Sequence, residues 1–250
     1  MTRTDGGRVL EVLEEVLARM GRTQPVPPVT TLLALAAVAA VLVVPRPLWR
    51  VSRMLVTIVH ESGHAVAAVL TGRRLSGIRL HSDTSGLTVS RGRPRGAGMV
   101  VTLLAGYPAA AVFGVATAAV LGTGRAVAFL WVVLGLLALM LLQVRNLYGL
   151  LVVLVVGGSL GAATWLLPGT YLSWLAHLIC WVLLLAAPRP VVELLLSGRH
   201  PGSDAGQLAR LTRVPERVWQ LLFLVVTSAA TVLGAALLLP LEEWTAAWWG

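Results

Sequence analysis

The clearest chemical signal in the sequence is the run His60-Glu61-Ser62-Gly63-His64. On an α-helix, residues four apart are separated by about 40° around the axis and about 6 Å along it. The two imidazoles therefore project from one face and can bind one zinc ion. Glu61 lies on the adjacent part of that face, where it can act as general base toward a water molecule at the metal. The pattern predicts a zinc site with His60 and His64 as ligands and Glu61 as the catalytic residue.

The motif lies inside an apolar segment, residues 48–70, of a strongly apolar chain. Hydrophobic residues make up 57% of the sequence and charged residues 12%, whereas about a quarter of an ordinary soluble domain is charged. Low charge combined with long apolar runs predicts a protein embedded in a lipid bilayer. Ionisable groups are costly in hydrocarbon, so their presence in such a segment indicates function.

Apolar segments and strand-like alternation together predict the fold. The apolar segments are 30–44, 48–70, 99–121, 126–143, 147–167, 172–187 and 218–239. Between the second and third, Ile78 and Leu80 alternate with polar residues, as do Leu87 and Val89, around a turn at 83–86. This alternation predicts a β-hairpin. We therefore expect an all-α polytopic membrane protein, a bundle of about seven transmembrane helices with a short β-hairpin after the motif helix.

A catalytic zinc site needs a third protein ligand and one position left open for water. The candidates are His81, Asp83, His177, Glu193, His200 and Asp204. We favour Asp204, because its polar segment, 197–217, falls on the same predicted side as the loop after the motif helix. A helix N-cap is the other interpretation of this aspartate, and Glu193 remains the alternative ligand. His81 and Asp83 also fit turn positions at a hairpin tip.

The net charge of +9 comes from arginine, since the chain contains no lysine. These arginines lie between apolar runs, which is typical of loops beside membrane spans and does not indicate a nucleic-acid partner. With seven spans and a cytoplasmic N-terminus, most arginines fall on the cytoplasmic side and the C-terminus lies outside; the cluster Arg46, Arg50 and Arg53 opposes this orientation. The arginine-rich, alanine-rich composition suggests a bacterial plasma membrane. The single cysteine, Cys180, excludes an internal disulfide and a cysteine-rich zinc site.

The motif within an apolar helix resembles the site-2 protease family of intramembrane zinc metallopeptidases. The arginine-rich hairpin segment and the glycine-containing run Leu104-Ala-Gly-Tyr-Pro108 are similar to the small bacterial branch of that family. The resemblance implies that His60, His64 and Asp204 bind zinc. It also implies that Glu61 activates water. At Asp204 the chain has Ser-Asp-Ala-Gly, where the family usually has Leu-Asp-Gly.

The sequence accordingly divides into an amphipathic cytoplasmic segment, 1–29, a transmembrane metallopeptidase domain, 30–239, and a C-terminal tail, 240–250. The domain includes the hairpin loop 72–98 and the polar segment 197–217. The expected function is hydrolysis of peptide bonds in or near transmembrane segments of membrane-protein substrates, as in regulated intramembrane proteolysis. An inert zinc-binding membrane scaffold is the main alternative. A metal transporter is less favoured, because it should carry ionisable residues on several spans. The sequence does not indicate the oligomeric state.

Overall fold

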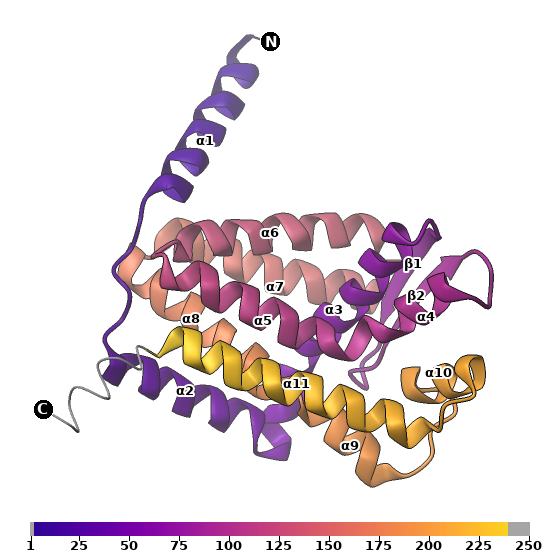
Figure 1. Ribbon diagram of the computed structural model, residues 1–250. Helices are drawn as coiled ribbons and strands as arrows, with labels where there is room; N and C mark the ends of the chain where they lie inside the picture. Colours follow the sequence, from indigo (N-terminus) through magenta and orange to yellow (C-terminus); the bar gives the residue numbers. More distant parts are fainter. Residues whose placement is uncertain (1–2, 240–250) are drawn as a thin grey trace, which may run out of the picture.

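The computed structural model describes residues 3–239 and is mainly helical (Figure 1). Its helices are α1 (Arg3–Gly21), α2 (Val29–Val43), α3 (Arg46–Leu70), α4 (Ala97–Leu104), α5 (Gly106–Gly122), α6 (Ala126–Gln143), α7 (Leu147–Leu166), α8 (Gly169–Ala186), α9 (Arg189–Ser197), α10 (Asp204–Thr212) and α11 (Glu216–Leu238). Strands β1 (Arg74–Leu80) and β2 (Gly86–Arg91) pair antiparallel directly after the motif helix α3. This confirms the predicted helical membrane architecture and hairpin. The predicted tail, 240–250, lies outside the described residues, and the division into three parts remains a prediction.

Four helical segments in this part of the chain are individually long and apolar enough to cross a membrane. They are α6, α7, the continuous stretch Gly169–Ser197 that contains α8 and α9, and α11. Two further pairs qualify only when their members are taken together: α2 with α3, bent by 101°, and α4 with α5, bent by 58°. The structure thus supports four to six spans, and the expected count of seven is not confirmed.

Prolines explain both bends. Pro45 precedes α3 as its N-cap, and Pro47 stands in its first turn. Proline has no N–H to donate, so the hydrogen-bond ladder of α2 stops at Pro45, and the extended backbone of Pro45 itself turns the chain into α3. In the second pair, Pro108 cannot donate to the carbonyl of Leu104, where α4 ends.

Hydrogen bonds between loops define the two ends of the bundle. At one end, the backbone N–H of Gln24 donates to Gly124 at 2.8 Å, and its side-chain oxygen accepts from Val127 N–H at 3.0 Å. At the other end, Arg145 N–H donates to Ile78 in β1 at 2.9 Å. The bent pair α2–α3 leads the chain from the first end to the second (Figure 1). The linker before α2 and the hairpin therefore lie at opposite ends, whereas the seven-span expectation placed them on the same side.

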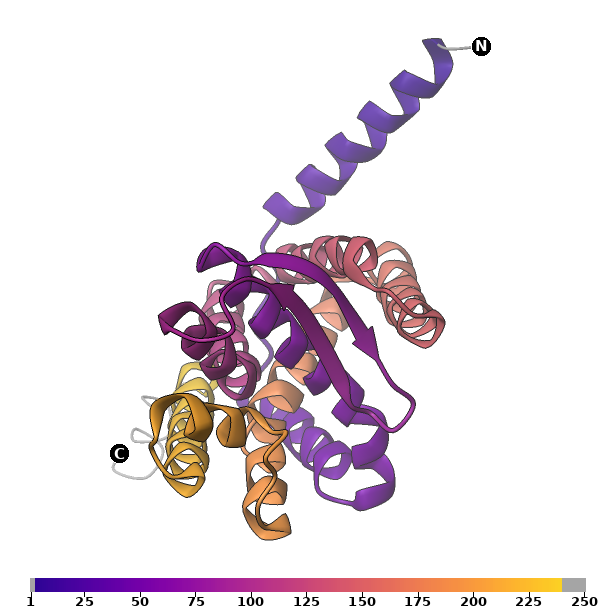
Figure 2. The same ribbon diagram turned by 90° about the vertical axis from the view of Figure 1, so that its right-hand side faces the viewer.

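The hairpin lies across α3 at its end of the bundle (Figure 2). Asn146, just before α7, fixes β1: its side-chain nitrogen donates to Leu80 O at 2.6 Å, and its side-chain oxygen accepts from Leu80 N–H at 3.2 Å. Thr57 in α3 donates to the carbonyl of Thr84 at the hairpin turn, at 2.8 Å. The first contact ties the hairpin to the start of α7, and the second fixes its turn on the helix that carries the motif.

Helix α1 projects away from the bundle (Figure 1). Its last turn is held by Arg19, whose guanidinium donates to Thr164 O at 3.3 Å and lies 4.6 Å from the ring centroid of Trp165. Val12 and Leu17 are exposed on the projecting part. These exposed apolar side chains belong to the helix that the sequence predicts to be amphipathic. The position of α1 relative to a membrane remains a prediction.

Candidate metal centre

His60 and His64 occupy successive turns of α3 and face each other. Their Nε2 atoms are 3.0 Å apart, and the rings meet edge to face with centroids 4.6 Å apart. His64 Nδ1 lies 2.7 Å from the carbonyl oxygen of Thr102 in α4. Because a carbonyl oxygen only accepts, Nδ1 carries the proton, and the Nε2 lone pair of His64 is left for a metal.

Asp204, the first residue of α10, meets this pair from a distant part of the chain. Its Oδ2 lies 3.3 Å from Nε2 of His60 and 3.3 Å from Nε2 of His64. The helix is capped by Ser203, whose hydroxyl oxygen accepts from Gly206 N–H at 3.1 Å, so Asp204 is not the N-cap. The structure therefore brings together the three residues that the sequence suggested as ligands.

A small apolar cluster holds α10 in place. Ala205 and Leu208, both fully buried, pack with Leu103 of α4, Val191 of α9 and Phe223 of α11. Burial of such side chains stabilises the docked helix by roughly 1.5–3 kcal/mol for each large one. This packing fixes Asp204 at the histidines although α10 itself is short.

The three side chains fit a divalent metal. Asp204 Oδ2 is buried, and no group among residues 3–239 donates a hydrogen bond to it. Burial raises the pKa of the Asp204 carboxyl, and the two imidazoles lower it by more when their Nε2 atoms are protonated. Tetrahedral zinc, with bonds of about 2.0–2.1 Å, places its ligand atoms about 3.3–3.4 Å apart. The observed separations of 3.0, 3.3 and 3.3 Å are close to this requirement.

The break between α4 and α5 forms one wall of the centre. A Cβ atom on Gly106 would lie 2.5 Å from His64 Nε2 and 2.7 Å from His60 Cε1, so only glycine leaves room for both rings. Beside it, the ring of Tyr107 packs edge to face on His60, with centroids 5.0 Å apart. In the sequence this run stands out only through a family resemblance, because nothing local indicates which glycine approaches the histidines.

Glu61 is buried next to the two histidines but points to the hairpin. Its side chain is 4% exposed, and its Oε2 accepts a hydrogen bond from the Thr88 hydroxyl at 2.6 Å. The residue expected to act as base is thus held by β2, a contact that no local sequence pattern predicts.

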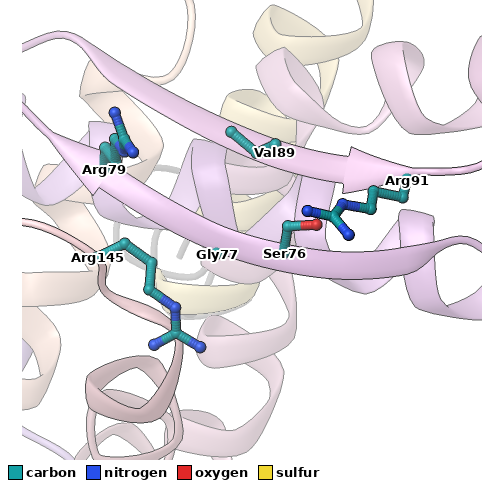
Figure 3. A pocket seen from close by; sticks show the side chains of 6 residues that line it. All are labelled: Ser76, Gly77, Arg79, Val89, Arg91 and Arg145. Carbon is teal, nitrogen blue, oxygen red and sulfur yellow. The ribbon is translucent and has the colours of Figure 1, made fainter.

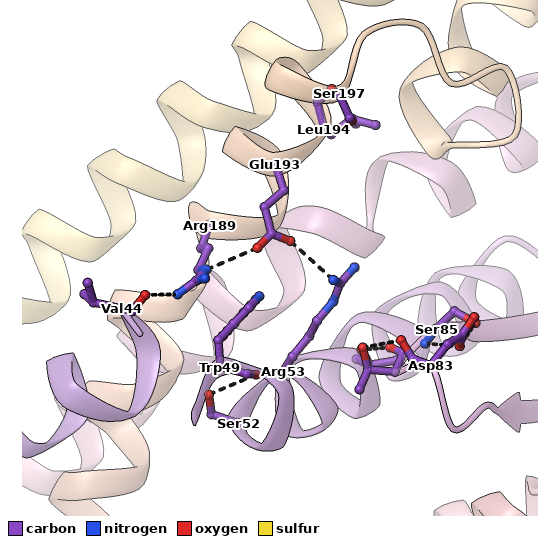
Figure 4. A network of polar contacts seen from close by, with 12 residues as sticks. Val44, Trp49, Ser52, Arg53, Asp83, Ser85, Arg189, Glu193, Leu194 and Ser197 are labelled. Carbon is purple, nitrogen blue, oxygen red and sulfur yellow. Dashed lines mark hydrogen bonds and ion pairs between the residues drawn. The ribbon is translucent and has the colours of Figure 1, made fainter. Parts of the chain in front are cut away.

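Glu193, the alternative third ligand, is engaged elsewhere (Figure 4). Its carboxylate pairs with Arg53 of α3 at 3.3 Å and accepts from Arg189 Nε at 3.2 Å. Arg189 also donates to the carbonyl of Val44 at 2.8 Å and lies 4.5 Å from the ring centroid of Trp49. Glu193 therefore belongs to a network that ties α9 to the bend between α2 and α3.

The remaining candidate ligands are also not part of the three-residue cluster. Asp83 accepts from the N–H and hydroxyl of Ser85 at 2.9 and 2.6 Å, which lowers its pKa and is typical of a turn residue. His177 is buried in α8 with Nδ1 2.7 Å from Ser173 O. The backbone N–H of His200 donates to Glu216.

A separate hollow of about 430 Å³ lies on the outer face of the hairpin (Figure 3). It is lined by Ser76, Gly77, Arg79, Val89, Arg91 and Arg145. Successive strand residues point to opposite faces, so Val89 and Arg91 face away from the side of β2 on which Thr88 meets Glu61. The hollow is therefore not an extension of the metal centre.

The fold and the cluster define a polytopic membrane protein with a His-His-Asp centre suited to a divalent metal. The chain belongs to the Peptidase M50B-like family, whose sequence model matches residues 33–234. This is a site-2 protease family, and membership implies a membrane metallopeptidase. Comparisons with curated proteins and with solved structures give no significant match.

Replacing any one of the three converging residues should impair metal binding. We expect His60→Ala, His64→Ala and Asp204→Ala each to lower metal affinity by at least about 10–100-fold, the range found when supporting groups of metal sites are lost. Metal content of the purified variants, measured by mass spectrometry, tests this. Glu193→Gln is the control and should keep its metal; full metal in Asp204→Ala would remove Asp204 from the ligand set.

Gly106→Ala should also weaken metal binding, although it removes no ligand, because the new methyl group would occupy the space of both imidazole rings. The expected loss is about 10-fold or more in affinity, measured by competition with a chelator. Gly135→Ala in α6 is the matched control, since a Cβ there meets no atom within 4 Å. Equal metal affinity in Gly106→Ala and Gly135→Ala would show that the space at Gly106 is not needed by the two imidazole rings.

Proposed function

We propose that this chain is an intramembrane zinc metalloprotease that hydrolyses peptide bonds in or near the transmembrane segments of other membrane proteins. The observation that carries the proposal is the convergence of His60, His64 and Asp204, with ligand atoms 3.0–3.3 Å apart, beside the buried carboxylate of Glu61. Family membership supports the reaction class.

The residues divide the chemistry between them. A zinc ion bound here would lower the pKa of a water molecule and polarise the scissile carbonyl. His60 and His64 present neutral nitrogen donors from one helix face, and Asp204 adds the negative charge that offsets part of the charge of the cation. Glu61 accepts the proton released by the attacking water and transfers it to the leaving amine nitrogen. Within residues 3–239, Oε1 of Glu61 has no hydrogen-bond partner, so it is the oxygen available to take that proton.

The substrate must be extended at the scissile bond, because a helical backbone keeps its carbonyls in hydrogen bonds. One edge of the hairpin is already occupied: β1 bonds to Arg145 N–H and to the side chain of Asn146. The other edge, along β2, has no partner strand in the described part of the chain. An extended substrate segment that adds to β2 would lie beside Glu61.

The arginines favour a cytoplasmic location for the hairpin end. That end carries Arg73, Arg74, Arg79, Arg91, Arg93, Arg95, Arg145, Arg199, Arg210, Arg213 and Arg217, whereas the opposite end carries Arg3, Arg8, Arg19, Arg22 and Arg125. Arg46, Arg50, Arg53 and Arg189 lie at the bend between α2 and α3 and on α9, and do not count for either end. In a bacterial plasma membrane the positive-inside rule then places the catalytic end in the cytoplasm. With six crossings, this proposal puts Gln24 and Leu239 both outside, and so differs from the sequence-based prediction of a cytoplasmic N-terminal segment.

Glu61→Gln should abolish proteolysis without loss of metal. The amide keeps the shape of the carboxylate but cannot take up a proton, so the rate of cleavage should fall by at least about 10²–10⁴-fold. Cleavage of a membrane-protein substrate and metal content should be measured on the same preparation. Unchanged cleavage would refute the role of Glu61, and metal binding without cleavage of any substrate by the wild type would favour an inert zinc-binding scaffold.

Single cysteines at the two ends of the bundle should react from opposite sides of the membrane. In a Cys180→Ala background, Thr123→Cys should react with an impermeant maleimide on intact cells. Ser82→Cys at the hairpin turn should react only after permeabilisation. Both positions are exposed. Labelling of both from the same side would contradict the single crossing by α2 and α3.

A further inference from the structure

The side chain of Glu61 packs against one face of β2. The strand alternates between half-buried and exposed residues, and Gly86, Thr88 and Ser90 share the half-buried face. Thr88 Oγ1 lies 2.6 Å from Glu61 Oε2 and 3.0 Å from the backbone oxygen of Glu61. A threonine hydroxyl has one proton, and the shorter contact is in the range of about 2.5–2.7 Å typical of a hydroxyl that donates to an ionised carboxylate. Thr88 therefore donates to Oε2 and leaves Oε1 free.

Gly86 supplies the space that this arrangement needs. A Cβ atom on Gly86 would lie 2.5 Å from Glu61 Cγ, 2.6 Å from Oε1 and 2.7 Å from Cδ. The φ angle of Gly86 is not in the left-handed region, so the backbone itself does not require glycine. The carboxylate of Glu61 is what excludes a side chain at this position.

The strand is held rigidly enough to act as a support. Gly86 pairs with Leu80 in the hairpin, and Leu80 is bound through both its N–H and its carbonyl by Asn146. At the turn, Thr84 O accepts from Thr57, one helical turn before Glu61 in α3. A catalytic group works best when its rotamer is locked by neighbouring hydrogen bonds and packing.

We propose that β2 positions the general base: Thr88 fixes the Glu61 carboxylate through Oε2, and Gly86 leaves the space that the carboxylate occupies. This inference rests on the proposed function for its kinetic consequence, but the contact itself does not. Thr88 and Gly86 are positioning residues, because neither belongs to the metal cluster. Their loss should therefore affect the rate of the chemical step and leave metal binding intact.

The kinetic test compares Thr88→Val, which keeps the shape and removes the hydroxyl, with Thr88→Ser, which restores the hydroxyl. We expect Thr88→Val to lower kcat for cleavage by about 10–100-fold, with KM changed less than about twofold and full metal content. Thr88→Ser should return kcat to within about threefold of the wild type. Gly86→Ala should lower kcat in the same way. Thr117→Val in α5 is the control and should leave kcat unchanged, because that hydroxyl bonds only to Phe113 O of its own helix.

Two kinetic outcomes would overturn the proposal. If Thr88→Val has the wild-type kcat, the hydrogen bond does not position the base. If Thr88→Val also loses metal, or Thr88→Ser fails to rescue kcat, Thr88 only maintains the structure of the site. In both cases the wild type still cleaves and Glu61→Gln does not, so the proposed function survives.

A second measurement is independent of cleavage. Amide hydrogen exchange of residues 86–91 should be about tenfold faster in Thr88→Val than in the wild type, since a charge-assisted hydrogen bond to α3 is lost. In a Glu61→Ala background, Thr88→Val should cause a much smaller further acceleration, because the hydroxyl then has only the backbone oxygen of residue 61 as a partner. Equal acceleration in both backgrounds would show that Thr88 does not pair with the Glu61 side chain and would overturn the proposal. Failure of the proposed function would look different: the wild type would cleave no substrate, while exchange would still show that Thr88 and Glu61 are coupled.

Discussion

Burial of the Asp204 carboxylate against two imidazoles is the interaction on which the arrangement of the other elements depends. An ionised carboxylate taken out of water costs several kcal/mol unless a positive charge or hydrogen bonds compensate. Within the described residues, its Oδ2 has only the two histidine nitrogens at 3.3 Å and no hydrogen bond. A bound cation is the simplest compensation. Apolar packing of α10 holds the carboxylate beside the two histidines.

Interrupted helices make this convergence possible. A straight α4–α5 helix would place a continuous cylinder beside α3, whereas the break before Gly106 lets the backbone approach both imidazole rings. The bend between α2 and α3 turns the motif helix beneath the hairpin, and the Glu193 network fixes that bend to α9. Irregular backbone at membrane depth is tolerated where it is covered by protein, and both breaks occur where other elements pack on them.

Helical periodicity is enough to predict that His60 and His64 share a face, and composition is enough to predict a helical membrane protein. The predicted side of the membrane is enough to propose Asp204 as the third metal ligand. It is not enough to exclude Glu193, because only tertiary contacts determine which of the two carboxylates reaches the histidines. From hydropathy alone, the apolar segments before and after Pro45 are predicted as two spans. Hydropathy does not tell whether the chain reverses its direction between two such segments or only bends within one span. The approach of Gly106 and the hydrogen bond of Thr88 are contacts between distant segments, and neither residue type signals them locally.

The position of Glu61 within the motif separates two tasks in space. One residue along a helix corresponds to about 100° of rotation, so Glu61 cannot point in the same direction as His60. The histidines face α10 and α5, whereas Glu61 faces β2. The three proposed metal ligands are therefore brought together by helices, and the proposed base is held by the hairpin. Because different elements support Glu61 and the three proposed metal ligands, a change in the hairpin can move the Glu61 carboxylate without moving the ligands. A substrate segment bound along β2 would therefore affect the position of Glu61 before that of the ligands.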